Sequence, residues 1–228
     1  MSAPFFLLPN TISFPDPRLA LADPNGLLAI GGDLNPERLL EAYRQGIFPW
    51  YNENQPILWW SPDPRAVLFL DELKISHSLA KLLKKPTFTI TMDRAFNQVV
   101  KACAAPRQEI PGTWIQPEMM ANYAKLHELG IAHSIEVWQD EKLVGGLYGL
   151  SIGQIFCGES MFSLVSNASK VALVELVKLL KQRQFALIDC QMLNPHLMSL
   201  GAQEIPRTEF LRILRENRDA PPLKKGAD

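Results

Sequence analysis

Hydrophobic and polar positions follow a regular pattern from residue 65 to residue 217. Alternating or continuous apolar runs predict strands, and apolar residues three and four positions apart predict helices. The expected strands cover 66–70, 87–92, 133–140, 142–153, 154–163 and 185–191. The expected helices cover 76–85, 94–103, 117–129, 168–183 and 208–217, with Asp93 and Thr208 as N-caps of the second and the last.

The order of these elements, β-α-β-α-α-β-β-β-α-β-α, predicts the fold class. Three consecutive hairpin-linked strands followed by a helix and a strand favour an α+β fold with a largely antiparallel sheet. Two helices show a clear apolar stripe. In the first, the stripe is Ile75, Leu79, Leu82 and Leu83; in the second it is Ala172, Leu173, Leu176, Val177 and Leu180.

The first sixty-odd residues differ from the rest, because they are dense in proline, glycine and tryptophan. One helix is expected from Pro36 to Gln45, with Asn35 as N-cap and Gly46 as the stop. The remainder is expected to form loops held by prolines. We therefore predict a small domain over 1–64 and a larger one over 65–228.

Composition and charge limit the partners and the location. The 228 residues carry a net charge of −1, so a nucleic-acid binder must concentrate its positive charge locally. Three cysteines in no metal-type spacing, with no signal peptide, predict reduced thiols in a cytosolic protein. No apolar run is long enough to span a membrane, and no histidine pair at i, i+4 predicts zinc.

The stretch "GESMFSLVSNASK" places Glu159 among apolar residues. Two interpretations stay open: the carboxylate reaches water, or it meets a cationic partner, since an unpaired buried charge is costly. The stretch "LIDCQ" raises the same question. Asp189 and Gln191 alternate with apolar positions and are expected on one face of a strand, where a carboxylate could orient an amide. The alternative is a strand end with two solvated polar residues.

Lysines and tryptophans form two further patterns. Lys74, Lys81, Lys84 and Lys85 make a positive stripe that is either a solvated face or a phosphate contact. Trp50, Trp59, Trp60 and Trp114 lie in loop-like segments, where each is either a core residue or a platform for stacking a base.

The strand–helix–strand core resembles the acetyltransferase superfamily built on the GNAT fold. In that superfamily a glycine-rich turn cradles the coenzyme A pyrophosphate. The corresponding turn here, "SLVSNASK", has no glycine. Backbone amides would then not be bared for close phosphate approach, so the fold is expected without the usual acyl donor.

Several longer blocks occur in order over residues 24–207: "PNGLLAIGGDL", "YRQGIFPWY", "ILWWSPDPRAVL", "GTWI", "LHELGIAHSIEVW", "LVGGLYG", "FCGESMFS", "NASK", "IDCQ" and "SLGAQEIPR". They resemble the leucyl/phenylalanyl-tRNA–protein transferase family. The resemblance implies a bacterial enzyme with a GNAT-like C-terminal domain. It would move leucine or phenylalanine, and less well methionine, from aminoacyl-tRNA to the N-terminal Lys or Arg of a protein. The product would then be degraded, and a monomer without cofactor or metal is implied.

The resemblance also implies roles for individual residues. Tyr43, Trp50 and Trp114 would hold the terminal adenosine of the tRNA, and Glu159, Asp189 and Gln191 would recognise the acceptor and serve catalysis. The apolar pocket for the aminoacyl side chain would use Leu147, Phe156, Met161, Leu173, Leu176 and Ile188. The family pattern also takes phenylalanine at position 176, so leucine there would change the depth of the pocket.

The implied reaction is aminolysis of an activated ester, for which alignment can supply much of the acceleration. Our hypothesis is that Gln191 hydrogen-bonds the incoming amine and that Asp189 orients Gln191. Two rival functions remain: a small-molecule N-acetyltransferase that uses acetyl-CoA, which the glycine-free turn disfavours, and a noncatalytic RNA-binding module. The RNA-binding module would leave the three polar residues without a purpose.

Overall fold

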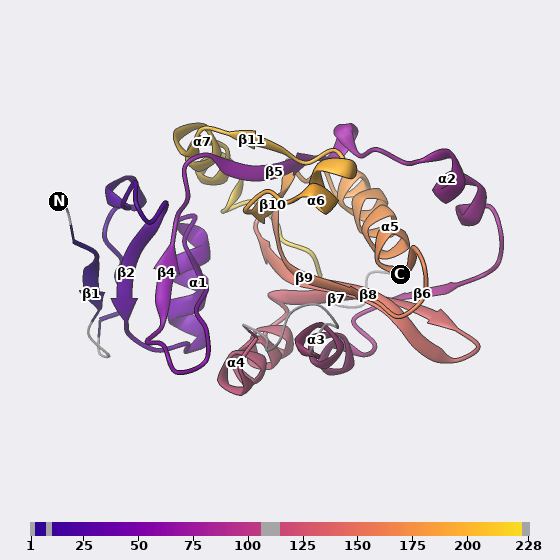
Figure 1. The fold of residues 1–228 in the computed structure, drawn as a ribbon, viewed down its shortest axis with the longest axis horizontal. Helices are drawn as coiled ribbons and strands as arrows, with labels where there is room; N and C mark the ends of the chain where they lie inside the picture. The colour runs from indigo at the N-terminus through magenta and orange to yellow at the C-terminus, as the bar shows by residue number, and fades with distance from the viewer. Residues whose placement is uncertain (1–2, 8–10, 106–114, 225–228) are drawn as a thin grey trace.

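The large sheet is built from β5 (Arg65–Phe69), β6 (Thr89–Met92), β7 (Ala132–Gln139), β8 (Lys142–Ile152), β9 (Ile155–Ser163), β10 (Leu187–Gln191) and β11 (Gln203–Ile205). In the computed structural model, which describes residues 3–7, 11–105 and 115–224, the strand order is β11-β5-β10-β9-β8-β7-β6 (Figure 1). Every neighbouring pair is antiparallel except β9 and β10. The predicted α+β class with a largely antiparallel sheet is confirmed.

Helices cover both faces of this sheet (Figure 1). Helix α5 (Ala168–Gln182) lies on one face, and α3 (Phe96–Ala104) and α4 (Pro117–Glu128) lie on the other. The apolar stripe predicted for α5 is buried along its whole length, from Ala172 to Leu180. The sheet therefore separates two apolar clusters, one under α5 and one under α3 and α4.

The N-terminal region contains a second sheet where the sequence predicted loops. Its strands are β1 (Phe5–Leu7), β2 (Leu27–Gly31), β3 (Phe48–Pro49) and β4 (Leu58–Trp60), in the order β1-β2-β4-β3. The loop prediction was wrong because these strands are short and carry little periodicity. They are held by tertiary contacts: Trp59 is fully buried, and its Nε1 donates to the carbonyl of Gly31 at 2.8 Å.

Helix α1 (Pro36–Arg44) forms as predicted, and its buried face carries Leu39 and Tyr43. These residues belong to the same apolar cluster as Tyr123 of α4 and Phe210 of α7 (Arg207–Asn217). Figure 1 places α1 between the small sheet and the large one. The boundary near Pro64 stays a prediction; β4 ends at Trp60, and β5 of the large sheet begins at Arg65.

Two predicted N-caps are wrong. Helix α3 begins at Phe96, not directly after Asp93, whose backbone is left-handed with φ of 59°. The Asp93 carboxylate instead accepts from the main-chain N–H of Ser134 at 2.9 Å. Helix α7 begins at Arg207, before Thr208, and the Arg207 N–H donates to the distant Asp63 carboxylate at 3.0 Å. In both cases a partner far along the chain decides the local geometry.

Smaller elements were not predicted. They are β11, α6 (Pro195–Ser199) and single 3-10 turns at Pro17–Leu19 and Leu70–Glu72. Helix α2 (His77–Leu83) is shorter than expected, and Ile75 before it is exposed rather than part of the buried stripe with Leu79. Short elements of this kind fall below the length at which periodicity is informative.

Candidate functional site

Two β-bulges mark the centre of the large sheet. In the β8–β9 ladder, Tyr148 pairs with Ser160 and Gly149 pairs with Gly158, so Glu159 is the extra residue. In the β5–β10 ladder the register also shifts, and Cys190 is the extra residue between Asp189 and Gln191. A bulge re-aims the side chains around it and is frequent next to functional sites.

The parallel strands β9 and β10 separate at the same place. Their pairing ends at Cys157 and Asp189, although both strands continue to Ser163 and Gln191. Beyond the last pair, side chains bridge the two strands, and Gln191 Nε2 donates to Glu159 Oε1 at 2.8 Å. This bridge brings two of the polar residues that the sequence singled out into direct contact.

Asp189 is held by an arginine that the sequence did not single out. Arg65 Nε and Nη2 donate to the two carboxylate oxygens of Asp189 at 2.8 and 2.7 Å, and both side chains are 1% exposed. The guanidinium also donates to the carbonyl of Gly46 and lies between the rings of Phe48 and Phe210. A two-pronged pair of this kind fixes geometry as well as charge.

Asp189 contacts Gln191 through the main chain. Its Oδ1 accepts from the Gln191 main-chain N–H at 3.0 Å, and Gln191 has the left-handed φ of 65°. The Asp189 carboxylate therefore fixes the bulge that carries Gln191. The Gln191 side-chain amide is held by Glu159, a contact that the alternating pattern of "LIDCQ" did not predict.

Glu159 accepts hydrogen bonds from neutral donors. Tyr43 OH donates to its Oε1 at 2.7 Å, and Tyr123 OH donates to its Oε2 at 2.9 Å. Burial raises the pKa of Glu159 to about 7, against the opposing effect of the hydrogen bonds from Tyr43, Tyr123 and Gln191. The side chain is 8% exposed. A carboxyl with this pKa can change its charge near neutral pH, which is a property common at reactive sites.

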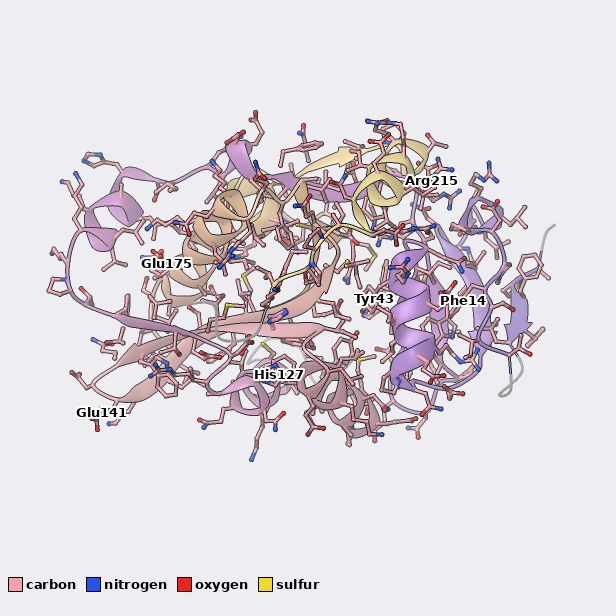
Figure 2. All side chains as sticks on the ribbon, turned by 180° about the vertical axis from the view of Figure 1, so that it is seen from behind. Phe14, Tyr43, His127, Glu141, Glu175 and Arg215 are labelled. Atoms are coloured by element: carbon pink, nitrogen blue, oxygen red, sulfur yellow. The ribbon has the colours of Figure 1, made fainter. Side chains whose placement is uncertain are left out.

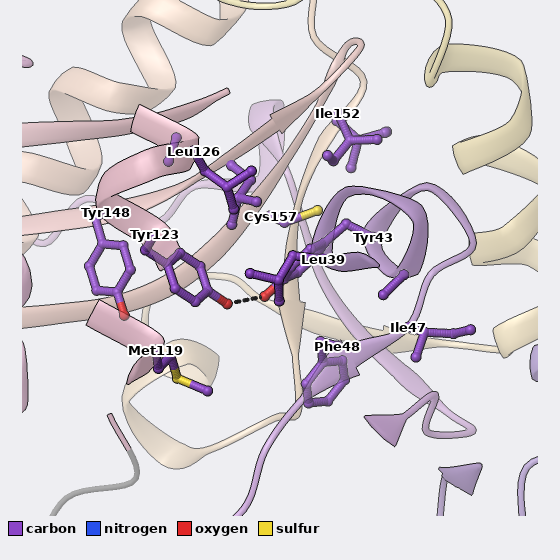
Figure 3. Packing of buried hydrophobic residues seen from close by; sticks show 14 of the residues in the cluster. Leu39, Tyr43, Ile47, Phe48, Met119, Tyr123, Leu126, Tyr148, Ile152 and Cys157 are labelled. Carbon is purple, nitrogen blue, oxygen red and sulfur yellow. Dashed lines mark hydrogen bonds between the residues drawn. The ribbon is translucent and has the colours of Figure 1, made fainter. Parts of the chain in front are cut away.

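The two tyrosines come from different parts of the chain. Tyr43 lies on α1, at the junction between the small sheet and the large one (Figure 2). Its hydroxyl is 2.5 Å from that of Tyr123 on α4 (Figure 3). Tyr123 was missed by the sequence reasoning. The available signal was its place on one helical face with Met119 and Leu126, where a buried phenol needs a polar partner.

The predicted pocket residues gather on the other face of the sheet. Leu147, Phe156, Leu173, Leu176 and Ile188 are 1–4% exposed in the cluster under α5, and Met161 is half-buried against it. The two surface hollows that are described, beside Phe185 and beside Arg207, lie elsewhere. The pocket residues and the tyrosines that contact Glu159 therefore belong to different apolar clusters.

The residues predicted to hold the terminal adenosine of the tRNA differ in their exposure. Trp50 is 38% exposed and stands edge-on to Trp60, whose Nε1 donates to the Trp50 carbonyl at 2.6 Å. Tyr43 is 1% exposed, so it has no free ring face for stacking a base. Trp114 lies outside the described residues.

The predicted lysine stripe is exposed. Lys74, Lys81, Lys84 and Lys85 lie on and around α2, at the end of the molecule opposite the small sheet (Figure 1). None of them forms an ion pair with a residue that the structure describes.

Within the described ranges, no group of three or more His, Cys, Asp or Glu side chains is arranged to hold a metal ion. No helix in the described part of the chain is long and apolar enough to cross a membrane. Cys103, Cys157 and Cys190 are not joined in disulfide bonds.

Distant solved structures resemble the chain. They include an aminoglycoside acetyltransferase from an uncultured soil metagenomic sample, with a TM-score of 0.38 and 12% identity over 49% of this chain and 83% of that one. A GCN5-related N-acetyltransferase from Kribbella flavida has a TM-score of 0.35 and 9% identity over 71% of this chain and 58% of that one. At such TM-scores these likenesses carry no argument about this chain.

Sequence relatives are much closer. A leucyl/phenylalanyl-tRNA–protein transferase of Nitrosomonas eutropha is 60% identical over 208 residues, covering 91% of this chain and 89% of the relative. One of Cellvibrio japonicus is 58% identical over 92% of this chain and 89% of the relative. The family's sequence model matches residues 67–215, and the model of its N-terminal domain matches residues 32–63. The chain belongs to the leucyl/phenylalanyl-tRNA–protein transferase family of enzymes.

Proposed function

We propose that this enzyme transfers leucine or phenylalanine from aminoacyl-tRNA to the N-terminal Lys or Arg of acceptor proteins, which marks them for degradation. Membership of the family, with about 60% identity to named relatives over nine-tenths of the chain, carries the proposal. The Glu159–Gln191 bridge supports it, because it offers polar groups for an amine at the point where two strands separate. The cytosolic location and monomeric state expected from the sequence stay predictions.

The reaction forms an amide from an ester and an amine. An α-amino group has a reference pKa of roughly 7.7–8.0, so part of it is neutral and nucleophilic at neutral pH. The ester is already activated, and correct alignment lowers the barrier without a strong base. In this proposal Gln191 receives the amine, and Asp189 holds Gln191 in place through its main chain.

Glu159 supplies attraction for the cationic acceptor residue. Asp189 attracts a cation less strongly than Glu159 would, because Arg65 already neutralises its charge. Among the described residues, no cationic side chain contacts Glu159. A Lys or Arg side chain of the acceptor would provide the missing positive charge, which gives a physical reason for a preference for these two residues.

The donor side chain would enter the apolar cluster under α5. That cluster consists of apolar side chains, so it would select leucine and phenylalanine by apolar burial. One methylene in such a pocket is worth about 1–3 kcal/mol, which allows weak use of methionine. Because five of the six residues are almost fully buried, α5 or its neighbours must shift to admit the donor.

The tRNA body would be held by general contacts. Trp50 exposes enough ring surface to stack the terminal adenosine, and the lysines around α2 would contact phosphates. Replacing Lys81, Lys84 and Lys85 by alanine is expected to flatten the salt dependence of donor binding, by about 0.7–0.9 in the log–log slope for each phosphate that is no longer neutralised. An unchanged slope, as expected for the control Lys142→Ala, would make the stripe a solvated face.

Radiolabelled transfer tests the proposed function. Phenylalanine should pass from Phe-tRNA to a peptide that begins with arginine, and a large part of the rate should be lost in Gln191→Ala. The matched control is Gln203→Ala, an exposed glutamine on β11 of the same sheet. No transfer by the unaltered enzyme would refute the function. Equal rates for Gln191→Ala and the control would refute only the role of Gln191.

The donor pocket has its own test. Met161→Ala should raise KM for Phe-tRNA by about tenfold or more, because the donor side chain would no longer bury its surface against the methionine. KM for the peptide should change less. Met92→Ala is the matched control, since Met92 packs against the same cluster from β6, outside the predicted pocket.

A further inference from the structure

Three oxygen–oxygen contacts join Glu159 and two tyrosine hydroxyls in a closed ring. The hydroxyls of Tyr43 and Tyr123 are 2.5 Å apart, Tyr43 OH is 2.7 Å from Glu159 Oε1, and Tyr123 OH is 2.9 Å from Glu159 Oε2. All three distances lie within the range of O–H···O hydrogen bonds. We call Tyr43, Tyr123 and Glu159 the acid ring.

The number of protons in the acid ring decides the charge of Glu159. Each tyrosine hydroxyl has one proton to donate, and an ionised carboxylate has none. With Glu159 ionised, two protons would serve three contacts, and one pair of oxygens would face each other with lone pairs only. With Glu159 protonated, every contact has its own proton, provided that the carboxyl donates to one tyrosine and accepts from the other. The Gln191 amide does not change this count, because it donates to Oε1 from outside the ring.

The charges around the acid ring point the same way. In the described part of the chain, the titratable groups that face Glu159 are Tyr43 from α1, Tyr123 from α4, Tyr148 from β8, Cys157 from β9 and Asp189 from β10. None of them is a cation, and the nearby Arg65 spends its guanidinium on Asp189. Burial favours the neutral carboxyl in such surroundings and raises its pKa to about 7.

We propose that Glu159 rests as a neutral carboxylic acid in the acid ring and that the cationic residue of the acceptor converts it into a carboxylate on docking. The positive charge of the acceptor would thereby create the base that its own amine needs. An acceptor without that charge leaves Glu159 protonated and unable to take a proton. This inference rests on the proposed function, and it adds to it a reason why the acceptor's charge affects chemistry as well as binding.

The proton balance closes over one turnover. When the cation docks, Glu159 releases its proton to solvent. The neutral amine then attacks the ester carbonyl carbon, the C–N bond forms, and the carboxylate takes the proton that the nitrogen loses. As the C–O bond breaks, the ribose oxygen receives that proton from Glu159. The sum is ester plus amine giving amide plus alcohol. After the product leaves, the carboxylate regains a proton from solvent.

Single-turnover transfer from Phe-tRNA at saturating peptide tests the proposal. Two peptides are compared from pH 5.5 to 8, one beginning with arginine and one with citrulline, which has the same shape but no charge. Titration of the α-amine affects both and cancels in the ratio of their rates. As pH falls below 7, the ratio of the arginine rate to the citrulline rate should rise, by up to about tenfold for each pH unit. The reason is that only in the arginine complex has Glu159 lost its proton.

Glu159→Gln is the matched variant, since an amide keeps the size but cannot titrate. Its ratio should not change with pH. A constant ratio in the unaltered enzyme, with transfer intact, would overturn this inference and leave the proposed function standing. Absence of transfer to both peptides would instead overturn the proposed function.

Infrared spectroscopy provides a second measurement that does not depend on activity. At pH 6 the unaltered enzyme should show the C=O band of a protonated carboxylic acid that is missing in Glu159→Gln. The arginine peptide should remove this band and the citrulline peptide should not. If no such band distinguishes the two proteins, Glu159 is ionised at rest and the proposal is wrong.

Discussion

Two buried carboxyl groups, on neighbouring strands that pair with each other, have different electrostatic partners. Asp189 is 1% exposed and is neutralised by the two-pronged contact with Arg65. Glu159 is 8% exposed, and the described residues that form hydrogen bonds with it, Tyr43, Tyr123 and Gln191, are all neutral. Burial alone therefore does not set the behaviour of a carboxyl. The partners also matter: among the described residues, Asp189 has a cationic partner and Glu159 has only neutral ones.

The difference assigns different work to the two residues. The Asp189–Arg65 pair joins β10 to β5 and holds the main chain of Gln191 in its bulge. Such a pair contributes geometry, because its cost of desolvation offsets much of its attraction. Among the described residues Glu159 has no fixed counter-charge, and it is thus able to respond to one that arrives with a substrate. Gln191 contacts both residues: its main-chain N–H donates to Asp189, which Arg65 fixes, and its side-chain amide donates to Glu159.

The largest effect is expected from breaking the rigid pair. Arg65→Met removes the counter-charge of Asp189 and should lower the free energy of unfolding by about 3–5 kcal/mol, because an uncompensated charge remains in the core. Urea unfolding measures this. The double variant Arg65→Met with Asp189→Leu should recover much of the loss. A single variant as stable as the unaltered protein would show that Asp189 does not need its partner.

The next effect concerns the pH dependence of stability that Glu159 contributes. The folded-state pKa of Glu159 is about 7, above its ordinary value of 4.5, so the folded state holds the proton more tightly than the unfolded state. The resulting stability is fully present below about pH 4.5 and is lost as pH rises through about 7. Relative to Glu159→Gln, the unaltered protein should lose up to about 1.4 kcal/mol per pH unit across this window.

Urea unfolding of both proteins at pH 5, 6, 7 and 8 measures the difference, in which the other titrating groups largely cancel. If the unaltered protein instead gains stability over Glu159→Gln as pH rises, Glu159 ionises more easily in the folded state, which would contradict a pKa raised by burial.

The smallest effect concerns the acid ring. Tyr123→Phe removes one hydroxyl that donates to Glu159. The loss of stability should be about 0.5–1.5 kcal/mol at pH 6, where the acceptor is neutral, and about 1.5–3 kcal/mol at pH 8, where it is charged. Tyr148→Phe is the matched control, since the Tyr148 hydroxyl is buried without a hydrogen-bond partner among the described residues. The control should cost little at either pH, and a pH-independent cost for Tyr123→Phe would contradict the titration of Glu159.

The sequence determined the regular part of the molecule. Long periodic segments such as α5 and the three strands β7, β8 and β9 were predictable, because burying one face of each element requires the pattern that the residues show. Glu159, Asp189 and Gln191 were identifiable as polar residues in apolar surroundings, and the family resemblance led to the same three positions.

Only the tertiary structure decided which groups these residues meet. Arg65 lies 124 positions from Asp189, and Tyr43 lies 116 positions from Glu159, so no local pattern could pair them. The two bulges, the separation of β9 from β10 and the small N-terminal sheet likewise depend on contacts between distant segments. The sequence of a strand fixes which of its side chains point to the same face of the sheet. The electrostatic environment of a carboxyl is fixed by whatever the rest of the chain packs against it, and that is why the charge of Glu159 could not be inferred from its neighbours in sequence.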